Sequence, residues 1–185
     1  PMRLCRYMPA EIPPVESLCV TALIRFLQPA QVFEIGTHRG RTTSLIAEHA
    51  PPQAVVHTLD LTLEELVQRK RRDRVQNDHV GEAFQDHPAA SKIVQLRSDS
   101  QTFYFSSFVG RMDFIFIDGD HSYEAAKQDT ANALRMIRSG GVILWDDYQP
   151  RFPGLIRCVE EFAVGRPIYR IPYTRFACYR HQGHG

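Results

Sequence analysis

The sequence has little cysteine, no long apolar run and almost no net charge. Its four cysteines are scattered over 185 residues, with no Cys-x-x-Cys pair and no histidine at zinc-ligand spacing. This spacing argues against a disulfide framework and against structural zinc, and it is typical of thiols in a reducing compartment. No apolar run approaches the length of a membrane span, and the first residues lack the charged-then-apolar pattern of a signal peptide. We therefore expect a cytoplasmic protein without a membrane partner.

The near balance of charges excludes a strong electrostatic field. With a formal net charge of +1, the chain has no excess of charge that would indicate nucleic acid as a partner. A hydrophobic content of 43% over 185 residues suffices for one core, but not for two ordinary domains. We expect a single domain over residues 1–185, with a helical entry at 1–30 and a tail at 181–185. The expected partner is a small-molecule acceptor with a hydroxyl group. The sequence is also compatible with a homo-oligomer.

Strand-like and helix-like segments alternate along most of the chain. Short apolar runs predict strands at 32–35, 55–59, 93–96, 114–117 and 142–145, and a closing pair at 168–171 and 176–179. Helical spacing predicts helices at 15–27, 42–49, 63–75, 100–109, 123–137 and 155–163, with a loop at 76–90. A capping box of Thr62 and Glu65 marks the start of the third helix, and Ser139-Gly140-Gly141 the end of the fifth. This order predicts an α/β fold: a Rossmann-like, doubly wound, mostly parallel seven-stranded sheet with an antiparallel C-terminal edge strand and helices on both faces.

A glycine turn, Glu34-Ile-Gly36-Thr-His-Arg-Gly40, follows the first predicted strand. Counted from Gly36, the second and third glycine positions of a dinucleotide fingerprint hold His38 and Arg41, which argues against a bound pyrophosphate. Asp60, at the end of the second strand, is placed to accept hydrogen bonds from ribose hydroxyls. Together these features indicate an adenosine-containing cofactor without pyrophosphate, whereas the glycines alone would fit an ordinary tight turn.

Two other features allow two interpretations each. Asp99, after the third predicted strand, is placed either to meet an adenine amino group or to cap a helix. The basic tract from Arg69 to Arg74 can hold a phosphate or an acidic substrate. Such runs are more often a solvated helix face, and we favour that interpretation.

Three aspartates follow two buried strands. Asp118 ends the fourth predicted strand, and Asp146 and Asp147 end the fifth. Because the carboxyl ends of parallel strands meet at one edge, these carboxylates should repel one another. Solvent, partial protonation or a hard cation would reduce this repulsion. Oxygen ligands suit Mg²⁺, Mn²⁺ or Ca²⁺ rather than zinc or copper. The alternative is a set of loop carboxylates with one helix cap, and we favour the metal site.

His121 lies three residues beyond Asp118, at the start of a predicted helix. Without context it is typical of a surface histidine beside the helix caps Asp120 and Ser122. Within reach of a metal-bound hydroxyl it is a candidate general base, because an imidazole titrates near neutral pH. Both interpretations stay open.

Taken together, these motifs resemble a known family. Glu34-x-Gly36-x-x-x-Gly40, Asp60 and the stretches 114–123 and 140–147 are similar to motifs of class I S-adenosylmethionine-dependent methyltransferases. Within that class they resemble the macrocin-type sugar O-methyltransferases and, more distantly, catechol O-methyltransferase. The resemblance covers residues 30–180.

The resemblance implies a role for each motif. The methionine part of S-adenosyl-L-methionine would be surrounded by Glu34, Gly36, Thr37, Gly40 and Thr42. The ribose would be bound by Asp60, the adenine by Asp99 and Ser100, and the cofactor also by Asp118. Magnesium would be held by Asp118, Asp146 and Asp147.

The implied activity is direct methyl transfer to a hydroxyl group of a small molecule. A divalent cation would chelate the acceptor hydroxyl, lower its pKa and hold it in line with the sulfonium methyl, while His121 or Asp118 takes the proton. The catechol enzymes carry Asn at the position of Asp147 and Lys at that of His121. Two alternatives stay open: a metal-independent methyltransferase, and a catalytically silent domain that binds the adenosyl cofactor.

Overall fold

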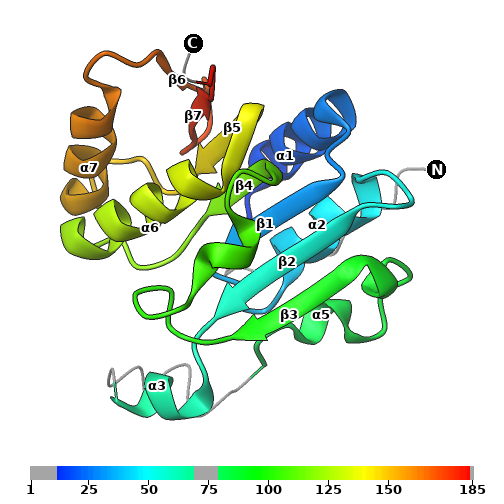
Figure 1. Ribbon diagram of the computed structural model, residues 1–185. Coiled ribbons are helices and arrows are strands. Elements are labelled where there is room, and N and C mark those ends of the chain that lie inside the picture. The colour runs from blue at the N-terminus through cyan, green and yellow to red at the C-terminus, as the bar shows by residue number, and fades with distance from the viewer. Residues whose placement is uncertain (1–11, 69–78, 184–185) are drawn as a thin grey trace.

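The chain is built around one twisted sheet, shown in Figure 1. This computed structural model describes residues 12–68 and 79–183. Its strands are β1 (Gln31–Ile35), β2 (Val55–Asp60), β3 (Ile93–Arg97), β4 (Met112–Ile117), β5 (Ile137–Trp145), β6 (Ile168–Arg170) and β7 (Ala177–Arg180). Its helices are α1 (Pro14–Leu27), α2 (Arg41–His49), α3 (Leu63–Gln68), α5 (Glu82–Gln85), α6 (Tyr123–Met136) and α7 (Pro153–Ala163), with 3₁₀ helices η1 (Ala90–Lys92) and η2 (Phe105–Phe108).

The strand order brings the ends of β1 and β4 together at the centre of the sheet. The order is β3-β2-β1-β4-β5-β7-β6. Strands β1 to β5 pair in parallel, while β7 is antiparallel to both β5 and β6. The chain winds outward from β1 to β3 and returns on the other side of β1, which makes a topological switch point between β1 and β4. The predicted fold class is confirmed.

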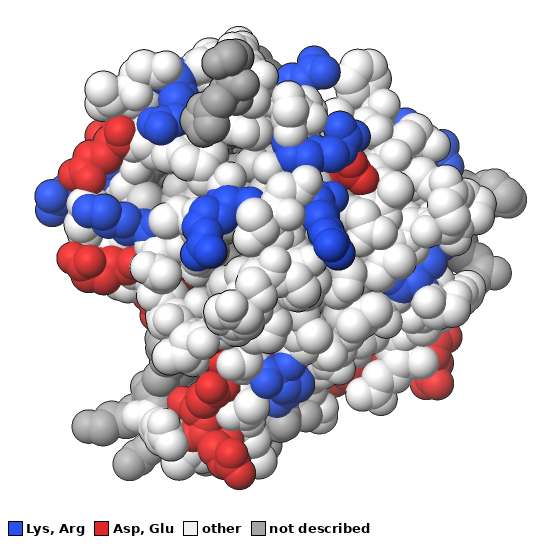
Figure 2. All heavy atoms as spheres, in the orientation of Figure 1, with Lys and Arg blue, Asp and Glu red and all other residues white. Residues whose placement is uncertain are grey.

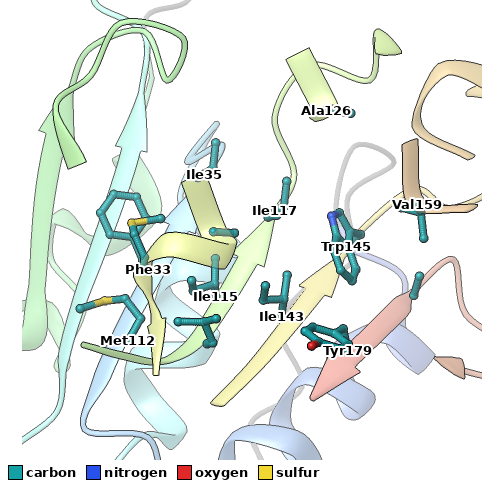
Figure 3. Close-up of a cluster of buried hydrophobic side chains, with 14 of the residues drawn as sticks. Phe33, Ile35, Met112, Ile115, Ile117, Ala126, Ile143, Trp145, Val159 and Tyr179 are labelled. Carbon is teal, nitrogen blue, oxygen red and sulfur yellow. The ribbon is translucent and has the colours of Figure 1, made fainter. Parts of the chain in front are cut away.

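Alternate strand residues build two cores, one on each face of the sheet. On one face, Phe33 and Trp145 belong to a cluster that packs against α6 and α7, shown in Figure 3. On the other face, Val32 and Phe114 belong to a cluster that packs against α1 and α2. Trp145 is fully buried, and its Nε1 donates a hydrogen bond to Thr130 Oγ1 at 3.0 Å. With both faces covered, the strand ends are the places where this sheet can present polar groups to a ligand.

The helix predicted at 100–109 is wrong. The chain there makes a turn, in which the carbonyl of Asp99 accepts from the Phe103 N–H at 2.9 Å, and then forms only the short η2. The rings of Phe103 and Phe105 pack edge to face, with centroids 4.9 Å apart. Residues two apart point to different sides of an α-helix, so this aromatic packing is incompatible with the helix that the spacing indicated.

The fifth helix ends earlier than predicted. α6 stops at Met136, and Ile137 already pairs with Met112 as the first residue of β5. The segment Ser139-Gly140-Gly141 therefore lies inside β5, where the register with β4 shifts. A Cβ on Gly141 would lie 2.6 Å from the side chain of Ile137. The glycine pair is thus needed for an irregular strand rather than for a helix end.

The region after β2 is described in part. The capping box is confirmed, because the Thr62 N–H donates to Glu65 Oε2 at 2.8 Å and the Glu65 N–H donates to Thr62 Oγ1 at 3.2 Å. α3 begins at Leu63 as predicted, and the basic tract 69–74 lies outside the described residues. The loop predicted at 76–90 is wrong in its described part, which contains α5 and the first residue of η1.

The surface carries both signs of charge. On the face shown in Figure 2, most basic side chains are separated from one another by uncharged ones, and acidic side chains gather toward the α3 end. In the described part of the chain, every helix is too short or too polar to cross a membrane. The described cysteines, Cys19, Cys158 and Cys178, form no disulfide, and Cys5 lies outside the described residues.

Candidate functional site

A polar cavity of about 280 Å³ lies at the carboxyl ends of β1, β4 and β5. Its lining residues are Ile12, Gly36, Thr37, His38, Arg39, Gly40, Arg41, Thr42, Asp118, Asp146, Asp147 and Arg175. The structure therefore brings together seven of the predicted site residues: Gly36, Thr37, Gly40, Thr42, Asp118, Asp146 and Asp147. The predicted residues that do not line this cavity are Glu34, Asp60, Asp99, Ser100 and His121.

The glycine turn fits tightly against the end of β4. Gly36 has φ +101°, and a Cβ there would lie 2.0 Å from the carbonyl oxygen of Asp118. The Asp118 N–H donates to the Ile35 carbonyl at 2.8 Å, which fixes the two strand ends to each other. Gly40 has φ +81°, and a Cβ there would lie 2.6 Å from the ring of Phe84. Both glycines are therefore required by the protein's own packing, whatever else they contact.

Glu34 lies beneath the turn, as the last residue but one of β1. Its side chain is fully buried, and Oε2 accepts hydrogen bonds from Thr58 at 2.5 Å and from Thr43. The other oxygen has no hydrogen-bond partner among the described residues. Burial is the main reason why the pKa of Glu34 rises to about 7. Thr37 joins the same group, since its Oγ1 lies 2.6 Å from Thr58 Oγ1. Glu34 thus supports the floor of the cavity from below.

Asp60 lies at the end of β2, as predicted, and its carboxylate holds the neighbouring backbone. Oδ2 accepts the His38 N–H at 2.7 Å, and Oδ1 accepts the Leu61 N–H at 2.8 Å. The first bond stabilises His38 in a left-handed conformation with φ +45°. The predicted contact of Asp60 with a ribose stays a prediction.

Asp99 shapes the turn after β3. Its Oδ1 accepts the Gln101 N–H at 2.9 Å, which is an Asx turn rather than the predicted helix cap, because no helix begins here. Its own N–H donates to Glu65 Oε1 at 3.0 Å, so the turn is tied to the start of α3. Adenine contacts of Asp99 and Ser100 stay predictions.

Asp118, His121 and Asp147 form the acidic group of the site. One ligand atom from each residue lies within 4.8 Å of the other two. His121 Nε2 lies 3.3 Å from Asp147 Oδ2 and 3.8 Å from Asp118 Oδ1, and its ring stacks on Phe152. Burial, followed by the charges of Asp146 and Asp147, raises the pKa of Asp118 well above its ordinary value. This group is chemically suited to a cation or to proton transfer.

Asp146 lines the same cavity but is not part of this group of ligand atoms. Its Oδ1 accepts the Asp147 N–H at 2.6 Å and lies 3.9 Å from Arg175 Nη2. Burial raises the pKa of Asp146 to about 7, although the charge of Arg175 acts in the opposite direction. Asp147 has φ +57°, a left-handed conformation that is uncommon outside glycine. Both aspartates therefore lie near Arg175, but only Asp147 also approaches His121.

Arg175 is the main site residue that the sequence analysis missed. Its Nη1 donates to Asp147 Oδ1 at 2.7 Å. Its Nε and Nη2 donate to the two oxygens of Glu16 at 2.9 and 2.6 Å, and its backbone N–H also donates to Glu16. Glu16 is only 2% exposed. No local sequence pattern relates two residues that are 159 positions apart. The sequence could have indicated a basic residue at the site only through the need of the acidic strand edge for a counter-charge.

A glycine turn, a buried acid below it and carboxylates at two neighbouring strand ends therefore surround one cavity at a switch point. Residues 33–148 match the model of a family described as a methyltransferase domain. The chain belongs to this methyltransferase family. The matched stretch runs from β1 through the glycine turn and Asp118 to Tyr148, directly after Asp147. The predicted resemblance to methyltransferases is thereby confirmed.

This methyltransferase has relatives of known sequence and structure. It is 24% identical over 141 residues to an uncharacterised protein of Acanthamoeba polyphaga mimivirus, a match that covers 72% of this chain and 61% of the relative. The chain thus spans less than two thirds of the length of that relative.

Solved methyltransferase structures share its fold. A protein from Klebsiella pneumoniae, described as a putative O-methyltransferase, superposes with a TM-score of 0.73 at 18% identity, over 95% of this chain and 84% of the other. The O-methyltransferase TomG from Streptomyces achromogenes, involved in tomaymycin synthesis and solved in complex with S-adenosylmethionine, superposes with a TM-score of 0.69 at 16% identity, over 94% and 82%. At these identities, the likeness establishes the fold of this methyltransferase and leaves its acceptor open.

Proposed function

We propose that this methyltransferase transfers a methyl group from S-adenosylmethionine to a hydroxyl group of a small molecule, with a divalent cation held by Asp118 and Asp147. The observation that carries the proposal is the group of ligand atoms of Asp118, His121 and Asp147, within 4.8 Å of one another beside the glycine turn. The bound S-adenosylmethionine and the O-methyltransferase name of TomG support the cofactor and the reaction class.

The cavity is chemically suited to the methionine end of the cofactor. That end carries an ammonium and a carboxylate, and the cavity is lined both by the three aspartates and by Arg39 and Arg41, of which Arg39 is ion-paired with Glu82. Arg41 is also the first residue of α2, whose N-terminus favours a negative charge. The ribose and adenine are assigned to Asp60 and to the turn after β3, as the sequence predicts.

The residues at the acidic edge fit a divalent cation. Four carboxylates, those of Glu16, Asp118, Asp146 and Asp147, interact with the guanidinium of Arg175. Two carboxylate oxygens with one imidazole nitrogen suit Mn²⁺ at least as well as Mg²⁺. We assign Asp118 and Asp147 as ligands, with His121 in place of Asp146 as the third candidate. A bound cation would lower the pKa of an acceptor hydroxyl.

The acceptor's proton would pass to the same acidic group. With Asp118 and Asp147 holding the cation and His121 uncoordinated, His121 is the residue that would take this proton, because an imidazole titrates near neutral pH. Its Nε2 lies 3.8 Å from Asp118 and 3.3 Å from Asp147, so both carboxylates would stabilise the imidazolium. Stacking on Phe152 fixes the plane of the imidazole. The enzyme therefore contributes to catalysis by positioning the acceptor against the cofactor and by stabilising charge electrostatically.

A metal-independent methyltransferase is the second candidate. The observation that favours it is the 2.7 Å hydrogen bond from Arg175 to Asp147, which already neutralises part of the acidic edge. Under this alternative, Arg175 replaces the cation as the counter-charge and His121 acts as the base.

Turnover with and without metal separates the two candidates. Hydroxylated acceptors, beginning with catechols and sugars, should be incubated with labelled S-adenosylmethionine in EDTA, in Mg²⁺ and in Mn²⁺. If methyl transfer stops in EDTA and returns when either metal is added, the metal-dependent enzyme is supported. If the rate of methyl transfer is unchanged by EDTA, the metal-independent enzyme is supported. Calorimetry with S-adenosylhomocysteine provides the control for binding. Tight binding without transfer to any acceptor would indicate the silent domain instead.

A further inference from the structure

A second cavity, of about 660 Å³, lies beside the candidate site. Arg175 lines both cavities, and the neighbouring residues Ile12 and Pro13 line one each. Arg175 also donates to Asp147 at 2.7 Å, so its guanidinium links the second cavity to the acidic edge. A volume of this size is typical of sites that enclose a small molecule. The function proposed above gives this cavity no role.

The lining of the second cavity carries an uncompensated positive charge. Arg175 and Glu16 both line it, and they form an ion pair with each other. Arg170 lines it as well, is exposed, and forms no ion pair with any described residue. A guanidinium that borders a cavity without a carboxylate partner favours an anionic ligand, because it matches the geometry of a carboxylate.

Arg170 ends the edge strand β6, and its charge acts close to the acidic edge. Burial and the charge of Glu160 raise the pKa of Tyr148, whereas the positive charge of Arg170 acts in the opposite direction. Tyr148 directly follows Asp147, and its N–H donates to the carbonyl of Arg175 at 2.7 Å. The two cavities thus share Arg175 and the chain segment around Tyr148, which favours a single ligand that extends from one cavity into the other.

The loop between β6 and β7 brings a strained aromatic residue to the second cavity. Pro172 and Tyr173 are at the centre of a tight turn, in which the Thr174 N–H donates to the carbonyl of Ile171 at 3.3 Å. The Thr174 hydroxyl donates to the same carbonyl at 2.8 Å. Tyr173 has φ +62°, at a turn position that normally carries glycine or asparagine when φ is positive. This conformation is unusual for a bulky residue.

Stability gives no reason for a tyrosine at this position. Tyr173 is 93% exposed, so its ring buries almost no apolar surface. A glycine would avoid the backbone strain. Strained residues are found preferentially where a protein contacts a ligand. Tyr173 lines the second cavity together with Val15, which is 45% exposed, so the two side chains offer an apolar contact surface to an aromatic ring.

We propose that the acceptor is an aromatic compound with a carboxylate, and that the second cavity binds the part of it that is remote from the reacting hydroxyl. The carboxylate pairs with Arg170, and the ring packs on Tyr173. The inference rests on the proposed methyl transfer, because the hydroxyl of the same molecule must reach Asp118 and Asp147 in the first cavity. Acidic aromatic acceptors are thereby favoured over neutral ones and over sugars.

The test measures the binding of three dihydroxyphenyl acids of increasing length, each against its own methyl ester. The acids are protocatechuate, homoprotocatechuate and caffeate, and calorimetry in S-adenosylhomocysteine and Mg²⁺ gives the affinities. At least one acid should bind about fivefold more tightly than its ester, the equivalent of about 1 kcal/mol and the upper end for an exposed ion pair. The preference should shrink at high salt concentration, because salt screens exposed charges.

Variants of two residues separate charge from packing. Arg170→Gln should abolish the preference for the acids and leave the affinity for the esters within about twofold, and Arg170→Lys should retain part of the preference. Tyr173→Gly should weaken the binding of acid and ester alike, by about threefold or more, since both present the same ring. Its melting temperature should not fall, because relief of backbone strain offsets the added freedom of the unfolded chain. A merely structural role of Tyr173 predicts the opposite.

Arg180→Gln and Tyr169→Ala are the matched controls. Both residues are exposed and belong to β7 and β6, and neither lines the second cavity. Each variant should leave the affinities for acid and ester unchanged. Equal affinity of acids and esters in the unmodified protein, no binding of any of these acids, an unchanged preference in Arg170→Gln, or an equal loss in Arg180→Gln would each overturn the inference.

Labelled S-adenosylmethionine keeps this failure distinct from failure of the proposed function. If the acids bind with the expected preference and no labelled methyl group is transferred to them, the proposed function fails, while the anion site at Arg170 is supported. If methyl transfer occurs equally to acids and esters, the proposed function stands and the inference fails.

Discussion

Arg175 donates hydrogen bonds from two side-chain nitrogens and from its backbone N–H to the carboxylate of Glu16, which lies 159 residues earlier in the chain. The same guanidinium donates to Asp147 at 2.7 Å. One side chain thus joins the first turn of α1 to the acidic edge of the sheet. The bond to Asp147 Oδ1 also leaves the other oxygen, Oδ2, facing His121. The position of the candidate ligand Asp147 therefore depends on a buried residue that belongs to a different element.

Removing Arg175 should destabilise the protein through Glu16. In Arg175→Met the carboxylate of Glu16 stays buried without its cation. We expect the free energy of unfolding to fall by about 2 to 4 kcal/mol. This loss is at or below the range for fully buried ion pairs, because a third of the Arg175 side chain is exposed to water, which screens its charge. Urea denaturation measures this loss. Replacing both residues, as in Glu16→Leu with Arg175→Met, should recover most of it.

The control for this prediction is an exposed pair. Arg157 and Glu161 lie one helical turn apart on α7, with 65% and 48% of their side chains exposed. Arg157→Met should change the unfolding free energy by less than about 1 kcal/mol. If it costs as much as Arg175→Met, the burial of Glu16 is not the cause.

The two neighbouring aspartates should differ in metal binding. Asp147→Asn removes a proposed ligand and should weaken Mn²⁺ binding by more than about 100-fold, whereas Asp146→Asn, which only supports the Asp147 backbone, should weaken it by about 10- to 100-fold at most. Paramagnetic resonance of free Mn²⁺ gives the bound fraction directly. Equal losses in both variants would restore the predicted ligand set of Asp118, Asp146 and Asp147.

The buried acid Glu34 should make stability depend on pH. Its folded-state pKa of about 7 lies above its ordinary value of 4.5, so the folded protein binds this proton more tightly than the unfolded chain. The resulting stabilisation is present below about pH 4.5 and is lost as the pH rises through about 7. Between pH 4.5 and 8, the unfolding free energy of the unmodified protein should fall relative to Glu34→Gln by at most about 3 kcal/mol.

The comparison with Glu34→Gln isolates this effect from other acids with raised pKa values, since Asp118, Asp129 and Asp146 titrate in both proteins. Denaturation curves at several pH values provide the measurement. Parallel pH profiles for the two proteins would show that Glu34 is ionised in the folded state throughout this range.

Gly36 should tolerate no side chain. A Cβ there would lie 2.0 Å from a backbone oxygen of Asp118 in a conformation with φ +101°, so Gly36→Ala must separate the ends of β1 and β4. We expect a loss of about 3 kcal/mol or more, together with loss of S-adenosylhomocysteine binding. Gly165→Ala is the matched control, because Gly165 has φ +74° but no atom within 4 Å of the added carbon. It should cost only about 1 to 2 kcal/mol, the strain of the left-handed conformation alone.

Local patterns of the sequence determined most of the elements, although not all of their ends. Alternating apolar runs, the capping box of Thr62 and Glu65, and aspartates at strand ends depend on residues close together in the chain, and each was predicted correctly. The parallel order then required Asp118, Asp146 and Asp147 to meet at one edge, because connections between parallel strands return the chain to the same side of the sheet.

Tertiary structure decided how that edge is used. Asp147 adopts a left-handed backbone conformation and its Oδ2 lies 3.3 Å from His121 Nε2, whereas Asp146 stays outside the group of candidate ligand atoms. The bond from Arg175 to Glu16 arises from packing between the two ends of the described chain. The turn that replaced the helix predicted at 100–109 follows from aromatic rings that pack together in three dimensions. Sequence patterns report the preferences of neighbouring residues, whereas these contacts depend on the burial and desolvation of groups far apart in the chain, which exist only once the sheet has formed.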